Sequence, residues 1–249
     1  MTTRTETVRT EHEGPVEIIT LDRPSRRNAV DAPAARELAA AVHGFEAGDA
    51  RVAVLTGAGG TFCAGSDLKA MAAGEFPAPA LDGPPPMAVT RTRTSKPVIA
   101  AIEGYCFGGG FELALWCDLR VASETAEFGL LNFEHGLPSL DGATVRLPRL
   151  AGHSRALDAL LTARRIPARE AAGWGLITTL TAPGEALKTA LALATRIASL
   201  PQPALRAART SILTQAPLSE PDALRNETAL ALTAAGSIPP DRPLRSRLP

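Results

Sequence analysis

Residues 52–69 read VAVLTGAGGTFCAGSDLK, and residues 98–112 read VIAAIEGYCFGGGFE. Each stretch begins with a short apolar run rich in β-branched residues, which predicts a buried strand. Each strand leads into a glycine-containing turn, and the run after the second turn, FELALW, has the apolar pattern of a helix. Two buried strands that each end in such a turn predict an α/β protein with parallel strands.

The flanking sequence extends this pattern in both directions. Val16–Leu21 predicts a further strand, and Asp31 with Pro33 predicts the start of a helix whose apolar residues recur at helical spacing. Strand, helix and strand in that order imply right-handed crossovers. Residues 1–14 are polar and are expected to be frayed, and residues 72–86, rich in Pro and Gly, are expected to form a mobile surface loop. From residue 153 to 234 the spacing predicts helices, interrupted by one short strand at 176–180.

Composition excludes several classes of function. The chain has 249 residues, with 26 Lys and Arg against 26 Asp and Glu, so its formal net charge is zero. Binding to nucleic acid or to an anionic membrane surface needs a basic surplus. The three cysteines, Cys63, Cys106 and Cys117, match no zinc spacing, and no apolar stretch reaches the roughly 18 residues of a membrane span. We therefore expect a cytoplasmic protein without metal, nucleic-acid or membrane partner.

The two glycine-containing turns indicate where chemistry takes place. Glycine leaves peptide groups bare, and the first amides of a helix have no partner within the helix. One amide from each turn would together bind a carbonyl oxygen that becomes negative during a reaction. The alternative is that residues 108–110 only allow close helix packing. A dinucleotide site at Gly57-Ala58-Gly59 is disfavoured, because Phe62 stands where Gly or Ala is needed.

The chain resembles the crotonase, or enoyl-CoA hydratase/isomerase, superfamily from about residue 16 to about residue 214. Besides the two stretches quoted above, the resemblance rests on NAV at Asn28, FG at Phe128, RLPRLAGHSRALDALLTAR at Arg146 and AAGWGLI at Ala171. It implies a crotonase-like spiral of ββα units in residues 1–195 and a helical oligomerisation region in residues 196–249. It also implies a homotrimer or dimer of trimers and an acyl-CoA thioester substrate, with no separate cofactor because coenzyme A is part of the substrate.

The resemblance also implies roles for single residues. The thioester oxygen would be held by the amides of Ala64 and Gly109. Coenzyme A would lie along two short segments, whose candidate contacts are Arg26, Asn28, Ala29, Ser66, Asp67, Leu68 and Lys69.

The acid/base residues depart from the family pattern. Hydratases of this family use two glutamates, and Glu112 matches the first, whereas Asn132 stands at the second. An amide cannot take up a proton. The family's glycine-rich segment is also altered, at residues 137–147, where it introduces Asp141. Since some relatives with other reactions, such as dehalogenation, place an essential aspartate in this loop, the resemblance implies Asp141 as the candidate second carboxylate, although Asp-Gly is also a common turn and a helix cap. Glu112 could instead be a solvated helix residue, and Glu134 and His135 lie near the lost position.

Three hypotheses remain open from the sequence. The first is a hydratase or isomerase with Glu112 as general acid/base. The second is other enolate chemistry, such as decarboxylation or dehalogenation, that uses Asp141. The third is an acyl-CoA binding protein without catalysis.

Overall fold

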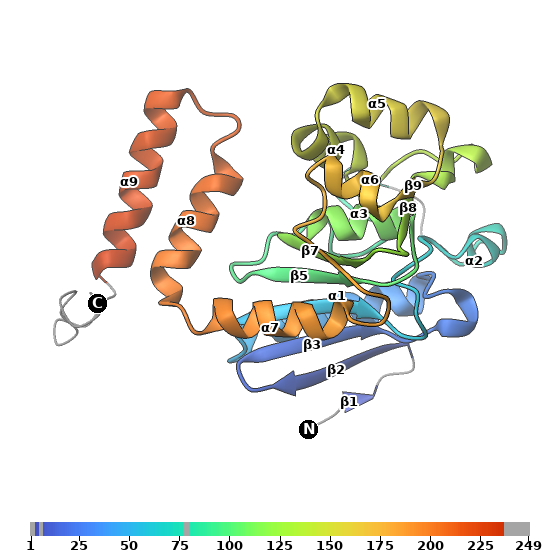
Figure 1. The fold of residues 1–249 in the computed structure, drawn as a ribbon, viewed down its shortest axis with the longest axis horizontal. Coiled ribbons are helices and arrows are strands. Elements are labelled where there is room, and N and C mark those ends of the chain that lie inside the picture. Colours follow the sequence, from blue (N-terminus) through green and yellow to red (C-terminus); the bar gives the residue numbers. More distant parts are fainter. Residues whose placement is uncertain (1–2, 5–6, 77–79, 237–249) are drawn as a thin grey trace. The chain divides into compact units, whose positions relative to one another are not determined.

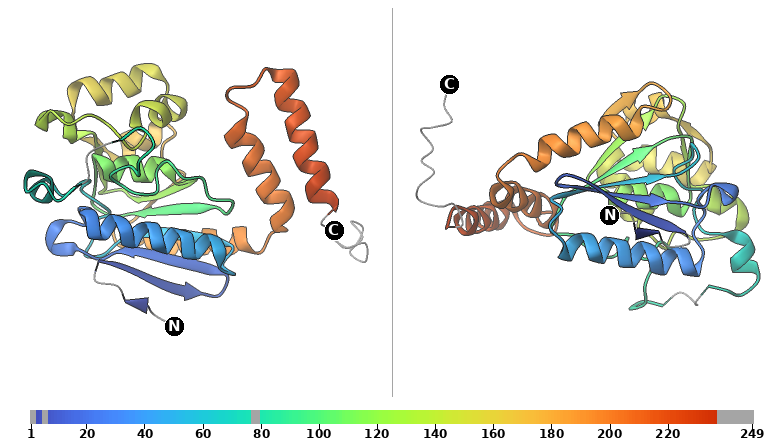
Figure 2. Two further views of the ribbon diagram at one scale, coloured as in Figure 1. Left: turned by 180° about the vertical axis from the view of Figure 1, so that it is seen from behind. Right: turned by 90° about the horizontal axis from the view of Figure 1, so that it is seen from below.

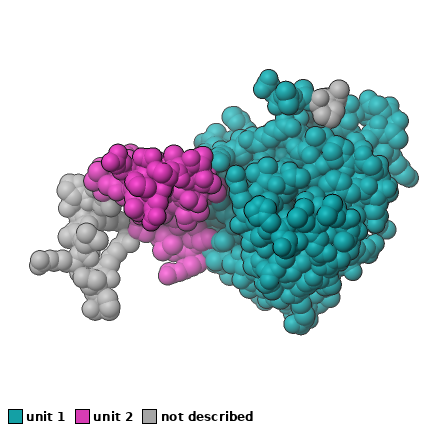
Figure 3. Space-filling model, turned by 90° about the horizontal axis from the view of Figure 1, so that it is seen from above, with its two compact units in different colours: residues 1–195 teal, residues 196–249 magenta. Residues whose placement is uncertain are grey.

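The structure of the chain is a computed structural model that describes residues 3–4, 7–76 and 80–236, with the backbone alone at residues 3–4. It divides into two compact units, residues 1–195 and residues 196–249 (Figure 3). The predicted site residues all belong to the first unit.

The first unit is built on a large sheet that follows the order of the chain (Figure 1). Among the described residues its strands are β1 (Thr3–Arg4), β2 (Val8–Glu13), β3 (Val16–Leu21), β4 (Val52–Gly57), β5 (Val98–Ile102), β7 (Leu119–Ser123) and β10 (Thr179–Thr181). β1, β2 and β3 are antiparallel neighbours, and all pairs from β3 to β10 are parallel. The carboxyl ends of β3, β4 and β5 therefore lie at one edge, where their loops meet.

The predicted strands at Val16–Leu21 and Val98–Ile102 are confirmed with those bounds. The prediction of a frayed start is wrong, because β2 forms a full antiparallel ladder with β3 from Val8↔Leu21 to Glu13↔Val16. Its sequence, VRTEHE, carries little apolar signal because most of its side chains are only partly buried or exposed. The predicted strand at 176–180 is shifted to Thr179–Thr181.

Helices cover the large sheet and connect its strands. α1 (Ala32–Ala47) begins after Asp31, whose side chain accepts a hydrogen bond from the Ala34 amide, and it packs against β2 and β3 (Figure 2). The other α-helices described in this unit are α2 (Leu68–Ala72), α3 (Gly109–Trp116), α4 (Ala143–Ala151), α5 (His153–Thr162) and α6 (Ala168–Gly173), and α7 (Ala186–Ala198) begins in it and ends beyond its last residue, 195. Residues 80–86 contain no helix or strand, and the rest of the predicted loop includes 77–79, which lie outside the described residues.

A second, small sheet carries the site. It consists of β6 (Tyr105–Phe107), β8 (Glu127–Gly129) and β9 (Ile166–Pro167). β6 is parallel to β8, and β8 is antiparallel to β9. Because β6 follows β5 after only two residues, the chain passes directly from the large sheet to the small one before it reaches residues 108–110. The α/β prediction is correct, and the short strands were missed because two or three residues show no periodicity.

The described part of the second unit is a pair of helices, α8 (Gln202–Thr214) and α9 (Glu220–Gly236), which pack on each other. Several of its large apolar side chains are exposed, among them Ile212 and Leu232. The basic tail noted at residues 239–249 lies outside the described residues. No helix in the described ranges has the length and apolar character that a membrane span requires.

Candidate functional site

The two glycine-containing turns lie side by side because the segments that lead into them are paired. Cys63 and Cys106 form a parallel bridge, in which the Cys63 amide donates to the Tyr105 carbonyl and the Phe107 amide donates to the Cys63 carbonyl, both at 3.0 Å. Both segments turn within two residues of this bridge. The turn at residues 64–66 therefore lies beside the start of α3.

The glycines of these turns leave no room for side chains. A Cβ on Gly65, whose φ is +95°, would lie 2.9 Å from the Phe107 carbonyl oxygen and 3.0 Å from the Gly109 nitrogen. A Cβ on Gly110 would lie only 2.2 Å from the Cys63 carbonyl oxygen. The close packing that the sequence left as an alternative is thus real, and it is also what brings the amides of the two turns together.

The amides of the two turns differ in whether they are free. Gly109 is the first residue of α3, and its amide has no partner among the described residues. The Ala64 amide, in contrast, donates to the carbonyl of Arg27 at 3.0 Å. The assignment of the Ala64 amide to the thioester oxygen is therefore wrong, since this amide already holds the protein's own loop together.

Two residues further on, the structure offers a different amide. The Val30 amide donates to the Gly65 carbonyl, and the Asp67 amide donates to the Val30 carbonyl, both at 2.8 Å. In this parallel bridge the groups of the residue between 65 and 67 point away from Val30. The Ser66 amide has no partner among the described residues and is the free donor beside Gly109. The sequence singled out Ser66 only as a coenzyme A contact.

Two of the predicted coenzyme A contacts are used by the fold itself. The Asn28 side chain is 1% exposed, donates to the carbonyls of Ala58 and Thr61 and accepts from the Arg23 amide. Ala29 is buried, and both its amide and its carbonyl are bonded within the loop. Both residues thus serve the loop's own hydrogen bonds, and their contact with coenzyme A stays a prediction.

The remaining predicted contacts differ in their exposure. Arg26, Leu68 and Lys69 are exposed. Asp67 is buried and bonds the amides of Lys69 and Ala70 at the start of α2. Burial would raise the pKa of Asp67, but these amides and the Arg23 charge outweigh it, so that its pKa is lowered. Asp67 is therefore an ionised residue that shapes the turn.

Arg23 is a positioning residue that the sequence did not single out. Its guanidinium forms ion pairs with Asp31 at 2.5 Å and with Asp67 at 3.2 Å. These carboxylates cap α1 and α2, so that Arg23 joins the two loops that flank Ser66. The only sequence signal was the basic character of residues 23–27, which is common in solvated loops.

Glu112 lies at the centre of the site and is 3% exposed. Its Oε1 accepts hydrogen bonds from the amides of Asp141 at 3.1 Å and Ala143 at 2.8 Å, the latter being the first residue of α4. Its Oε2 accepts no bond from the described chain and is not among the fully buried unpartnered atoms, so it is open to a ligand. A solvated position is excluded.

The pKa of the Glu112 carboxyl is raised to about 7. Burial is the largest cause, and the nearby Asp141 charge raises the pKa further, while the two amides and the Arg146 charge lower it. A carboxyl with this pKa exists in both protonation states near neutral pH. It is therefore suited to accept and return protons.

Asp141 adjoins Glu112 and is also 3% exposed. Its Oδ1 accepts from the Met87 amide at 3.0 Å and from the Thr90 hydroxyl at 2.5 Å. Burial raises its pKa, against the hydrogen bonds from Thr90 and Met87. Asp141 is no helix cap, because the N-cap residue of α4 is Gly142 and no side chain bonds the helix start in the manner of a cap. Its contacts tie residues 87–90 to the site.

Asn132 lies close to the start of α3. Its Nδ2 donates to the Leu137 carbonyl at 2.8 Å, and its Oδ1 is buried without a partner in the described chain. A Cβ on Gly108 would lie 3.8 Å from this Oδ1. The buried, unpartnered acceptor is suited to hold a water or a substrate hydroxyl. Glu134 and His135 are exposed, and no contact connects them with Glu112.

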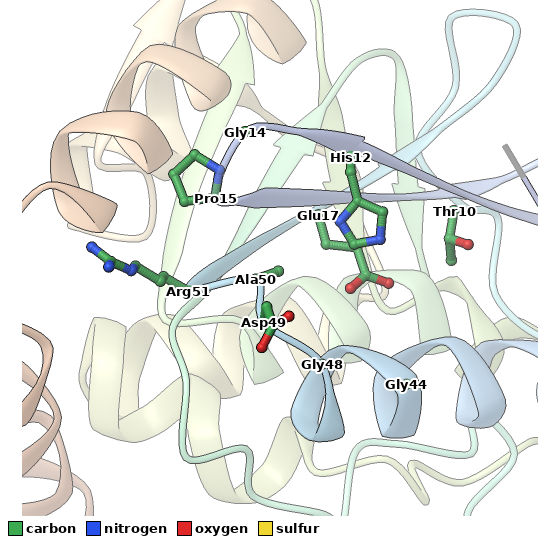
Figure 4. A pocket seen from close by; sticks show the side chains of 10 residues that line it. All are labelled: Thr10, His12, Gly14, Pro15, Glu17, Gly44, Gly48, Asp49, Ala50 and Arg51. Atoms are coloured by element: carbon green, nitrogen blue, oxygen red, sulfur yellow. The ribbon is translucent and has the colours of Figure 1, made fainter. Parts of the chain in front are cut away.

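A cavity of about 890 Å³ lies apart from this site (Figure 4). It lies where β3 and β4 begin and α1 ends, among side chains that include His12, Glu17 and Arg51. None of the predicted site residues lines it. No group of three or more His, Cys, Asp or Glu residues within the described ranges could hold a metal ion.

Fold and site together define a class of protein: an α/β protein in which two backbone turns present free amides beside a buried carboxyl that titrates near neutral pH. The family model for enoyl-CoA hydratase/isomerase matches residues 11–235, and the chain belongs to this family. The family consists of enzymes for acyl-CoA thioesters, and the chain is an acyl-CoA thioester enzyme of the hydratase/isomerase type.

Individual relatives agree with this assignment. A Rhizobium meliloti protein named probable enoyl-CoA hydratase is 40% identical over 230 residues, which cover 90% of this chain and 88% of the relative. A carnitinyl-CoA dehydratase of Salmonella arizonae is 40% identical over 197 residues, which cover 77% of this chain and 74% of the relative. The crystal structure of an enoyl-CoA hydratase from Mycobacterium tuberculosis superposes with a TM-score of 0.88 at 36% identity, covering 94% of this chain and 92% of that one. The crotonase-like fold expected from the resemblance is thereby confirmed.

Proposed function

We propose that the protein adds water to, or shifts the double bond of, an enoyl-CoA thioester, with the amides of Ser66 and Gly109 binding the thioester oxygen. Negative charge gathers on this oxygen when the enolate forms. Two fixed donors stabilise that charge without reorganisation, and such donors are worth about 3 kcal/mol each in a transition state. The observation that carries the proposal is a free amide on each of two turns in contact with one another.

Glu112 carries the protons in both directions. In hydration its ionised form takes a proton from water as the oxygen bonds to Cβ, and electrons move onto the thioester oxygen. The proton then passes from Glu112 to Cα as the enolate collapses. In isomerisation the same carboxyl moves a proton from one carbon to another. A single carboxyl is sufficient because its pKa of about 7 lies near the operating pH.

Asn132 assists hydration by accepting a hydrogen bond from the attacking water through its unpartnered Oδ1. Asp141 assists through its charge, which raises the pKa of Glu112, and through its bonds to residues 87 and 90. The relatives' printed names, a hydratase and a dehydratase, support water addition or its reverse over the alternatives. Nucleophilic use of Asp141, as in a dehalogenase-like reaction, has less support because its Oδ1 is already bonded twice.

Coenzyme A would extend from Ser66 over the exposed surface of Arg26, Leu68 and Lys69. The two cations there suit the phosphate groups, and no further cofactor is needed. For the second unit we propose the predicted role in a trimer or a dimer of trimers, since a pair of helices with exposed Ile212 and Leu232 buries little of its own apolar surface. We also propose a cytoplasmic location.

Replacement of Ser66 tests the oxyanion assignment. Ser66→Pro removes the amide hydrogen, whereas Ser66→Ala keeps it and changes only the side chain. With crotonyl-CoA as substrate, we expect Ser66→Pro to lower kcat about 10²- to 10³-fold and Ser66→Ala to change it less than about threefold. Binding of butyryl-CoA by calorimetry confirms that both variants are folded. Equal kcat in the two variants contradicts the assignment, and binding without turnover in the wild type supports the third hypothesis, a non-catalytic protein.

A further inference from the structure

The side chain of Met87 packs directly on Gly109, the first residue of α3. Met87 is fully buried, and a Cβ on Gly109 would lie 2.9 Å from its Cε and 3.1 Å from its Sδ. The thioether of Met87 thus fills the space next to the Cα atom of Gly109, the residue whose amide is free. A thioester held through its oxygen at Gly109 has the first carbons of its acyl group in this region.

The backbone that carries Met87 is fixed from two sides. The Met87 amide and the Thr90 hydroxyl both donate to Oδ1 of Asp141. The Arg146 guanidinium donates to the carbonyls of Asp141 and Thr90. The segment therefore holds its place, while the side chain of Met87 has three rotatable bonds and adapts or is replaced without a change in the backbone.

Behind this segment lies an apolar cavity of about 400 Å³. Its wall is formed by the side of α1 and the proline-rich segment: Ala32, Ala35, Arg36, Ala39, Phe76, Pro84, Pro85, Pro86 and Ala88. Pro86 and Ala88 flank Met87 in the chain, so a wall one residue thick separates the cavity from Gly109. Its volume is within the range of small-molecule sites, and its lining suits a hydrocarbon chain.

We propose that Met87 is a specificity-determining residue that closes the acyl end of the site against this cavity. The wild-type protein then prefers thioesters of short acyl groups, such as four carbons. Truncation of Met87 joins the cavity to the site and admits a longer, unbranched acyl chain, which is the occupant that the apolar lining fits. This inference rests on the proposed function in one respect, namely that the thioester oxygen binds at Gly109.

The test measures binding and needs no turnover. Butyryl-CoA and decanoyl-CoA are titrated calorimetrically into the wild type, Met87→Ala and the control Met71→Ala, which removes the same atoms from a methionine on α2 outside the cavity wall. We expect Met87→Ala to bind decanoyl-CoA at least about tenfold more tightly than the wild type, with butyryl-CoA changed less than about threefold. Met71→Ala should keep the wild-type order of the two ligands.

A second variant tests whether the gain in decanoyl-CoA affinity depends on the cavity. Ala35→Leu, placed in the Met87→Ala background, refills the space beside α1 and should abolish the gain for decanoyl-CoA. Met87→Val serves as a milder truncation if Met87→Ala does not fold, with the same direction of change. Equal decanoyl-CoA affinity in the wild type and the truncated variants overturns the inference while butyryl-CoA binding remains. Failure of the wild type to bind either ligand overturns the proposed function itself.

Discussion

Replacement of Glu112 by Gln separates its chemical role from its structural one. The carbonyl oxygen of Gln can still accept the bonds that the amides of Asp141 and Ala143 donate to Oε1. The join between α3 and α4 is therefore kept, while the capacity to carry a proton is lost. Because general acid/base catalysis contributes about 10²- to 10⁴-fold, kcat should fall by that factor with crotonyl-CoA as substrate.

The same variant should be more stable than the wild type at alkaline pH. The pKa of Glu112 is about 7 in the folded protein, against an ordinary value of 4.5. At a pH between these two pKa values, Glu112 is protonated in the folded state and ionised in the unfolded state. The free energy of unfolding therefore falls as pH rises from about 4.5 to 7. The loss amounts to about 3 kcal/mol, and Gln, which does not titrate, escapes it.

Two measurements check this prediction. Urea unfolding of both proteins at pH 4.5 and pH 8.5 should show nearly equal stability at the lower pH and a more stable variant at the higher one. The wild-type kcat/KM should rise with pH to a plateau above about 7, because Glu112 must be ionised to take the first proton. The matched control is Glu134→Gln, which replaces an exposed carboxyl and should leave the pH dependence of both stability and kcat/KM unchanged. A kcat for Glu112→Gln within threefold of the wild type refutes the proposed role, and identical stability profiles refute the raised pKa.

Three further predictions follow from the contacts of the site. Gly110→Ala should lower the free energy of unfolding by about 3 kcal/mol, because its Cβ would collide with the Cys63 carbonyl at 2.2 Å, whereas Gly173→Ala has open space and should change it by less than about 1 kcal/mol in the same thermal melts. Asn132→Ala should slow crotonyl-CoA hydration about tenfold or more, because Oδ1 of Asn132 would no longer hold the attacking water. Exchange of the α-protons of butyryl-CoA in D₂O uses no such water and should stay nearly unchanged, so an equal effect on both reactions would count against water binding. Arg23→Ala should raise KM for crotonyl-CoA and lower the free energy of unfolding by about 1–3 kcal/mol, because the carboxylates of Asp31 and Asp67 lose their cationic partner; an unaltered KM would show that the loops do not depend on it.

Much of the fold could be predicted from local patterns. Val98–Ile102 is a continuous apolar run and Val16–Leu21 is rich in β-branched residues, because both strands are buried in the sheet, and such patterns are visible without any tertiary information. The cap of α1 at Asp31 is likewise a local hydrogen bond between neighbours in the chain. β2 escaped prediction because most of its side chains are only partly buried or exposed, so that its sequence shows no apolar run, although its backbone pairs fully with β3.

The sequence by itself determined the candidate residues of the site: the glycines of the two turns and, through the resemblance to the crotonase family, Glu112 and the replacement of the second glutamate by Asn132. These features are local, since a positive φ, a helix start and a residue's ability to titrate depend on residue type and immediate neighbours. Only the tertiary structure decided which amides are free, because the partner of Ala64 is the distant Arg27 carbonyl, and it showed that Asn28 and Ala29 serve the loop's own hydrogen bonds. It alone placed Asp141 against Met87 and raised the pKa of Glu112, since hydrogen bonding and burial are set by segments that are far apart in the chain.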